Sequence, residues 1–464
     1  MQFLDFPIEI LPEIIDHLAK PQHLAHLCLV NKTFRPFATS QLYQKVYIYS
    51  WHREGKTKVI KLFDTLSRYA YLASYLRLLE IRDFPKAITA VDNDILNLVL
   101  RGLKNCVNLT SCIWTRDGSL NSDFLRALQC CGKLRRLEFN GHNEGHYDAR
   151  FLMGFTQLER ILIIMPSPAV VSQIKPWLSV TGATLRSFTL ICKGSNLITD
   201  TLLQSVAPLL PNLEDFHLTG CPKVTHHGVW SVVSATSNGL LGLGLEGVSP
   251  KFDMALFASR CTSTGALKRL CSITLTVHQQ LSINEWAGDV LDLVADSPLE
   301  RFQIYSTGAS FEASATEELW KQLVVTHSGR LARISVHRML ISLDAIANIC
   351  SRCVNLEELF IVMESGSFDQ LANCLSVAKK LRTVHINSPV EASVEIFPFV
   401  LRAEQALSII RRCHSSLTQF GCNSKVWQVD RRIMRDEDGR LRAERILAPY
   451  GSPEVPEQFL VVRV

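Results

Sequence analysis

The sequence predicts an α/β solenoid with a short helical region in front of it. Two observations lead to this fold class. A unit of the form L-x-x-Φ-x-Φ, in which Φ is apolar, recurs along most of the 464 residues, and residues 4–46 carry apolar side chains at helical spacing. A hydrophobic fraction of 47% with 20% charged residues is typical of a globular chain, so both patterns belong to folded structure.

The N-terminal region predicts three short helices. Apolar residues recur at i, i+3, i+4 and i+7 in the first segment and at similar intervals in the next two: Leu11, Ile14, Ile15, Leu18; Leu24, Leu27, Leu29, Val30; Phe34, Ala38, Leu42. Helices this short bury too little surface to be stable alone. We therefore expect part of their apolar surface to meet another protein.

Four motifs stand out in this region: Phe6-Pro7, Glu9-Ile10, Leu18 and Val30-Asn31-Lys32-Thr33-Phe34-Arg35. Together they resemble an F-box, with Phe6 in place of the usual Leu and Phe34 in place of the usual Trp. The resemblance implies docking on a Skp-family adaptor and, through it, on a cullin–RING ubiquitin ligase. The residues expected to bind the adaptor are Pro7, Ile10, Leu11, Ile14, Ile15, Leu18, Leu24, Leu27, Val30 and Phe34. The alternative is an ordinary helical cap on the domain that follows.

The repeat unit predicts a leucine-rich repeat solenoid. Its first leucine falls at positions 76, 109, 134, 158, 185, 213, 240, 270, 299, 331, 356, 381 and 417, with intervals from 24 residues (Leu134 to Leu158) to 36 (Leu381 to Leu417). Alternating apolar positions predict a half-buried strand in each unit. The stretches between the strands carry helical patterns, and we expect capping boxes at Ser282-x-x-Glu285 and Ser314-x-x-Glu317.

One unit, Leu213 to Thr225, contains Cys221 where leucine-rich repeats usually have Asn, and it resembles the cysteine-containing repeat found behind F-boxes. The combination resembles fungal F-box proteins with C-terminal leucine-rich repeats, which implies an irregular horseshoe. The expected domains are an F-box at 1–48, a solenoid at 49–425 of about 13 degenerate repeats with a helical linker in the first, and a capping tail at 426–464. In that tail we expect a hairpin that turns at Asp436–Gly439, then an extended segment at Phe459–Val464.

Residues that alternate with the buried strand positions should line the concave face of the solenoid and contact a protein ligand. Those expected to bind a substrate are Arg136, Glu138, Asp215, His217, Arg301, Tyr305, Arg333, His337, Glu358, Phe360 and His385. The alternative is a solvated sheet face without a ligand.

Other classes of protein find little support in the sequence. A net charge of +5 without a basic run is too mild to indicate nucleic acid or a membrane surface. Gly242-x-Gly244-x-x-Gly247 matches a dinucleotide fingerprint but falls inside a predicted strand, where that motif does not function. We expect no metal, no cofactor and no catalytic residues. The scattered cysteines and the lack of a leader-like N-terminus favour the cytoplasm or the nucleus.

The resemblance therefore implies a non-catalytic subunit of a Skp–cullin–F-box ubiquitin ligase, whose repeats hold a target protein for ubiquitination and proteasomal degradation. The alternative is an adaptor-bound scaffold or interaction module that has no degradation role. The sequence does not separate the two, because both functions need the same two surfaces.

Overall fold

Every repeat begins with a buried leucine, and a strand starts two residues later. In the computed structural model, each of the leucines predicted to open a unit is at most 5% exposed, and β2 (Leu78–Ile81) follows Leu76 as β14 (Gln419–Cys422) follows Leu417. The structure describes residues 7–18, 20–49, 52, 54–85, 93–278, 281–307, 313–364, 366–389, 401–435 and 441–450. Phe6, the turn at Asp436–Gly439 and the Phe459–Val464 segment lie outside these residues.

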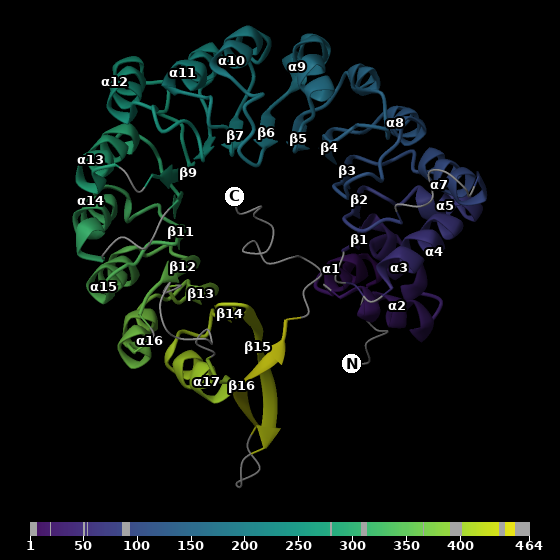
Figure 1. Cartoon of the computed structure of the whole chain (residues 1–464). Coiled ribbons are helices and arrows are strands. Elements are labelled where there is room, and N and C mark those ends of the chain that lie inside the picture. Colours follow the sequence, from purple (N-terminus) through teal and green to yellow (C-terminus); the bar gives the residue numbers. More distant parts are fainter. Residues whose placement is uncertain are drawn as a thin grey trace, which may run out of the picture. The chain divides into compact units, whose positions relative to one another are not determined.

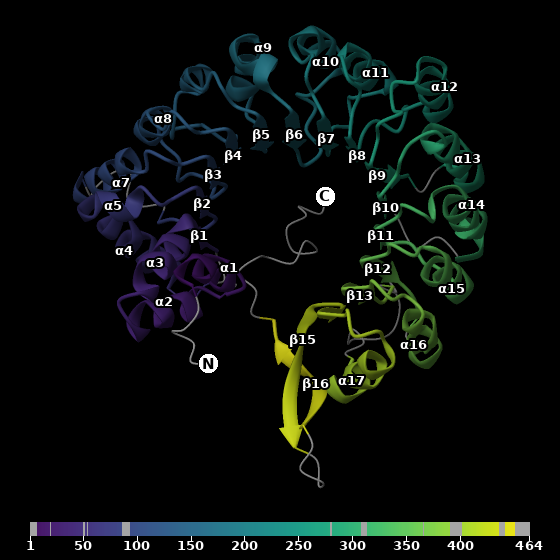
Figure 2. The same cartoon turned by 180° about the vertical axis from the view of Figure 1, so that it is seen from behind.

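The chain divides into two compact units, which part at Leu213. The N-terminal unit runs to Leu213 and includes Ala235–Ser237; the C-terminal unit holds Glu214–Ser234 and continues from Asn238. In each unit the strands lie on the inner side of an arc and the helices on its outer side (Figure 1), and the view from behind shows the same two layers (Figure 2). This layering is that of a leucine-rich repeat solenoid, as predicted.

In the N-terminal unit, six strands pair in parallel and in chain order. They are β1 (Lys45–Ile48), β2, β3 (Ser111–Trp114), β4 (Arg136–Asn140), β5 (Arg160–Ile164) and β6 (Ser187–Ile191). Its α-helices are α1 (Leu11–Asp16), α2 (Pro21–Val30), α3 (Phe34–Gln44), α4 (Gly55–Arg68), α5 (Ala70–Ala73), α7 (Asn93–Asn105), α8 (Ser122–Gln129), α9 (Pro168–Thr181) and α10 (Asp200–Val206). Short 3-10 segments are η2 (Ile8–Ile10), η3 (Ala149–Gly154), η4 (Gly182–Thr184) and η5 (Ala207–Leu209).

In the C-terminal unit, β7 to β14 pair in parallel, and β15 and β16 then continue the sheet in antiparallel fashion. The strands are β7 (Asp215–Thr219), β8 (Gly242–Glu246), β9 (Ser272–Val277), β10 (Arg301–Ser306), β11 (Arg333–His337), β12 (Glu358–Val362), β13 (Thr383–Asn387), β14, β15 (Lys425–Arg435) and β16 (Leu441–Pro449). The helices are α11 (His226–Ala235), α12 (Met254–Thr264), α13 (Ile283–Val294), η6 (Ala313–Thr316), α14 (Glu317–His327), α15 (Leu343–Arg352), α16 (Phe368–Ser376) and α17 (Ala403–Arg412).

The core lies between strands and helices. Pairing register aligns the inward side chains of successive strands into rows, such as Ile81, Trp114, Phe139, Ile163 and Leu190, all essentially inaccessible. Burial of apolar side chains of this size contributes about 1.5–3 kcal/mol each. The rows explain why the spacing of repeats can vary while the strand motif cannot: insertions fall in the loops and helices, outside the rows.

The predictions of capping boxes were wrong. Neither expected capping box forms: Ser282 precedes α13 without a side-chain hydrogen bond to the helix, and Ser314 lies inside η6. Thr316 stands before α14, but its hydroxyl donates to the Ala313 carbonyl and accepts from Trp320 Nε1 at 3.0 Å. The predicted F-box segment 1–48 also contains a strand that the helical pattern did not indicate, β1, which pairs with β2.

Candidate functional site

The N-terminal helices form a small core of their own. Leu11, Ile15, Leu24 and Phe34 are buried together, and Leu18, Leu27, Phe37 and Leu42 pack against them. Of the residues predicted to bind an adaptor, these buried four hold the three helices together and are not open to a partner. Leu18, Leu27 and Ile10 are partly buried.

The remaining predicted adaptor residues lie on the outside. Ile14 is 37% exposed and Val30 63% exposed, and Pro7 is exposed as well. The structure adds two neighbours that the motif comparison missed, Ile8 and Leu29, at 49% and 84% exposed. Exposed aliphatic side chains next to a packed core are a surface that gains free energy when a partner covers it.

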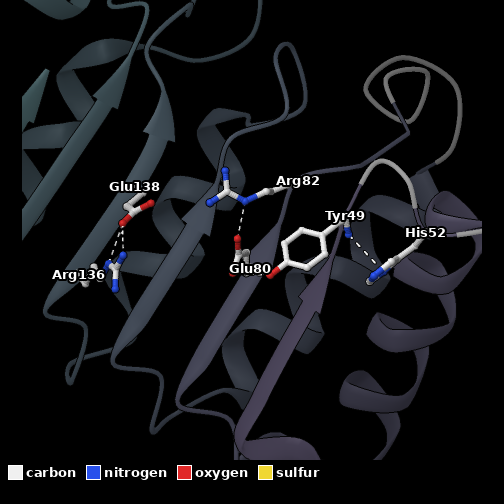
Figure 3. Close-up of polar contacts among 6 residues, drawn as sticks. All are labelled: Tyr49, His52, Glu80, Arg82, Arg136 and Glu138. Atoms are coloured by element: carbon white, nitrogen blue, oxygen red, sulfur yellow. Dashed lines mark hydrogen bonds and ion pairs between the residues drawn. The ribbon is translucent and has the colours of Figure 1, made fainter. Parts of the chain in front are cut away.

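The concave face of the N-terminal unit carries polar pairs (Figure 3). On β4, Arg136 Nε donates to Glu138 Oε1 at 2.8 Å. On β2, Glu80 pairs with Arg82, which directly follows the strand, and Glu80 also accepts from the Tyr49 hydroxyl at 3.4 Å. Each carboxylate therefore has an arginine two residues away in the sequence, which neutralises it locally.

These pairs affect the neighbouring aromatic groups. Burial, followed by the negative charge of Glu80, raises the pKa of the Tyr49 hydroxyl well above its ordinary value. Burial lowers the pKa of His52, whose Nδ1 accepts from the Tyr49 backbone N–H, and Lys58 lowers it further. Both groups are thus held in their neutral forms near neutral pH.

The concave face of the C-terminal unit carries a run of aromatic rings. Tyr305, His337, Phe360 and His385 come from β10, β11, β12 and β13, with ring centroids 4.5, 6.5 and 6.3 Å apart in that order. Arg333 lies over the Phe360 ring, 4.9 Å from its centroid. We call these four rings the aromatic ladder.

A polar network runs beside the ladder. Gln303 donates from Nε2 to the Tyr305 hydroxyl at 2.7 Å and accepts from Arg333, and Arg333 also pairs with Glu358 at 3.3 Å. These contacts hold Arg333 in one orientation. Arg301, its neighbour on β10, is exposed and forms no ion pair or side-chain hydrogen bond with any described residue.

The predicted substrate-binding residues all lie on the concave side of their own unit, but they are less open than a free surface requires. Glu138, Tyr305, His337, Phe360 and His385 are buried by their cross-strand neighbours, and only Arg301 is exposed. The remainder are half-buried: Arg136, Asp215, His217, Arg333 and Glu358. The alternation rule gives the correct side of the sheet and cannot give the packing between strands.

Some concave residues were missed in the sequence. Glu80 and Arg160 occupy the same rows as predicted residues, as the strand register shows, and Arg82 directly follows β2. Extending the alternation rule to the units that begin at Leu76 and Leu158 would have found them. Among the described residues, no group of three or more His, Cys, Asp or Glu is placed to hold a metal ion, and no helix there is long and apolar enough to cross a membrane.

The chain is similar to known proteins in sequence and in structure. The chain is 31% identical over 141 residues to the F-box protein DAS1 of Saccharomyces cerevisiae (strain ATCC 204508 / S288c), a match that covers 28% of this chain. The chain spans only 20% of the length of that relative. A crystal structure of a TLR13–ssRNA13 complex matches 68% of this chain and 45% of that chain, with 14% identity and a TM-score of 0.33. No family model matches the sequence.

The repeat architecture rests on this chain's own strands and helices, and the sequence match supplies a distant F-box relative. The chain folds as a leucine-rich repeat solenoid and is distantly similar in sequence to an F-box protein, as its motifs predicted.

Proposed function

We propose that this chain is the substrate-recognition subunit of a Skp–cullin–F-box ubiquitin ligase. Helices α1 to α3 would dock on a Skp-family adaptor, and the concave faces of the repeats would hold a target protein. The chain itself would supply proximity, which raises the effective concentration of target lysines near the conjugating enzyme.

One observation carries the proposal. Within the short N-terminal helices, one set of apolar side chains is packed into a core while Ile14 and Val30 stay exposed. A helical cap that served only its own domain would turn its exposed apolar residues inward. A docking module needs a buried set, which holds its helices together, and an exposed set, which contacts the partner. The distant similarity to an F-box protein supports the proposal.

The experiment is co-purification of the full chain with a Skp-family adaptor. Ile14→Asp combined with Val30→Asp should abolish the complex, because an aspartate in a desolvated apolar interface leaves a charge unpaired. Val354→Asp is the matched control, since Val354 is 65% exposed and lies far along the sequence in the C-terminal unit. Adaptor binding by the folded double variant would overturn the proposal.

The scaffold alternative uses the same two surfaces. It is distinguished from the receptor by whether the protein bound to the repeats is degraded. A receptor's target should accumulate in cells that carry the docking variant in place of the wild type, and quantitative proteomics measures this. If the docking variant loses the adaptor and no protein's half-life rises, the chain is an adaptor-bound scaffold.

A further inference from the structure

Two arginines stand directly opposite each other on the concave face of the N-terminal unit. Arg136 on β4 and Arg160 on β5 are register partners. Like charges in directly opposite positions of a sheet destabilise it. A pair of this kind persists only where another group offsets the repulsion.

Arg136 has a negatively charged neighbour that offsets the repulsion, and among the described residues Arg160 does not. Arg136 is held by Glu138 through its Nε, at 2.8 Å, and through a second short contact from its Nη2. Arg160 is exposed and makes no ion pair or side-chain hydrogen bond within the described part of the chain. The pair therefore presents one positive charge without a counterion.

Ser111 stands on the other side of Arg136 in the same row. It is the β3 register partner of Arg136 and is 8% exposed. Its hydroxyl has no hydrogen-bond partner among the described groups. A buried polar group without a partner costs about 1–3 kcal/mol, so a ligand that accepted a hydrogen bond from Ser111 would recover this free energy.

The charge of the surrounding face has the same sign. The concave positions of β1 to β5, with the residue that follows β2, contain Lys45, Arg82, Arg136 and Arg160 against Glu80 and Glu138. The comparable arginines of the C-terminal unit, Arg301 and Arg333, share their row with Glu358 and Asp215 and carry no such excess. The excess of positive charge on the concave side therefore lies on the N-terminal unit.

We propose that Arg136, Arg160 and Ser111 form a site for an anionic side chain on an extended acidic segment of a partner protein. The guanidinium groups offer forked N–H donors that match a carboxylate or a phosphate group, and Ser111 adds a hydroxyl donor at the edge. The inference rests on the proposed function in one respect: it gives the chemical class of target that the repeats hold.

The test uses the full chain and fluorescein-labelled peptides of alternating residues: Glu-Gly, phosphoserine-Gly and Gln-Gly. The two anionic peptides should bind and the Gln-Gly peptide should not. Arg160→Gln should weaken binding by about tenfold or more, as expected for the loss of a charge-assisted hydrogen bond. Ser111→Ala should weaken it by about fivefold or more, because it removes a hydroxyl that donates to the anion.

The matched control is Arg126→Gln on α8, which removes the same charge from the helical side of the same unit. Equal weakening by Arg126→Gln and Arg160→Gln would show a response to net charge and would overturn the site. Failure of the wild type to bind either anionic peptide would overturn it too. Binding of only one of the two, lost in Arg160→Gln, supports the site and identifies its anion as carboxylate or phosphate.

Adaptor co-purification distinguishes this inference from the proposed function. Arg160→Gln should keep the adaptor, since Arg160 lies on a repeat strand and not on α1 to α3. If the wild type failed to bind an adaptor while the contrast between the Arg160 and Arg126 variants persisted, the proposed function would fail and the anion site would stand.

Discussion

The rings of Tyr305 and His337 stack face to face, with centroids 4.5 Å apart and planes within 11° of parallel. The two residues are register partners on β10 and β11. Stacking has buried both side chains on a face that the sequence pattern assigns to a ligand. The aromatic ladder is therefore part of the stability of the C-terminal unit as well as part of its concave surface.

Tyr305→Ala should destabilise the C-terminal unit by about 3 kcal/mol, because it removes a buried aromatic ring and one side of the stack. Arg301→Ala, four residues away on the same strand, should change stability by no more than about 0.5 kcal/mol, since its side chain is exposed. Chemical denaturation followed by circular dichroism measures both. Equal effects of the two changes would mean that the ladder does not contribute to folding.

The contrast between Arg301 and Tyr305 on β10 shows which structural features the sequence could predict and which it could not. The repeat leucines and the alternation of buried residues were enough to place every strand from β2 to β14, because burial on one face of a strand depends only on spacing. Whether Tyr305 faces solvent or a neighbouring ring depends on the residue across the strand pair, His337. Thirty-two positions separate the two residues in the chain, since 337 − 305 = 32.

The N-terminal helices show the same limit. The motif resemblance named ten residues for the adaptor surface, yet Leu11 and Ile15 turn inward while Ile14 between them stays exposed. Helical spacing groups residues on one face but does not tell which face a partner covers. The third helix pattern ends at Leu42, and the strand that follows it, β1, was not predicted, because Val46 and Ile48 fit either structure until β2 is available to pair with them.

A second prediction concerns the charge state of His217 on β7. Burial lowers its pKa, Asp215 raises it, and Arg301 lowers it. Arg301→Gln should therefore raise the pKa of His217, and Asp215→Asn should lower it further. Nuclear magnetic resonance titration of the imidazole measures both shifts. The two variants must move the pKa in opposite directions; shifts of the same sign would contradict the arrangement of these three residues.

A third prediction follows from His327, which lies buried at the end of α14. Burial, and then the charge of Arg330, lower the pKa of this imidazole below its ordinary value. The folded state thus binds a proton less readily than the unfolded state, so the associated stability is present above the unfolded pKa of about 6.5 and is lost as pH falls through the folded pKa. His327→Leu should reduce the loss of stability between neutral and mildly acidic pH.

The measurement is the midpoint of thermal unfolding across that pH range. His23→Leu is the control, because His23 is exposed on α2. The idea fails if the His327 variant loses as much stability on acidification as the wild type.

The last prediction concerns glycines beneath concave histidines. His217 lies across Gly244 of β8 and His385 across Gly421 of β14, in each case so close that a Cβ on the glycine would overlap the imidazole ring. Gly244→Ala or Gly421→Ala should force the histidine out of its position and destabilise the C-terminal unit by about 1–3 kcal/mol, the usual cost of overpacking.

Gly288→Ala is the matched control, since Gly288 lies inside α13 and a Cβ there would meet no atom within 4 Å. It should stabilise the unit by up to about 1 kcal/mol, because alanine favours the helix over glycine. Thermal unfolding compares all three variants, and the imidazole resonances of His217 and His385 report the displaced ring. The change in stability must be opposite in sign for the two strand glycines and for the helix glycine. A stabilising Gly421→Ala would mean that His385 has room to move, and that the concave surface is packed less tightly around it than the structure indicates.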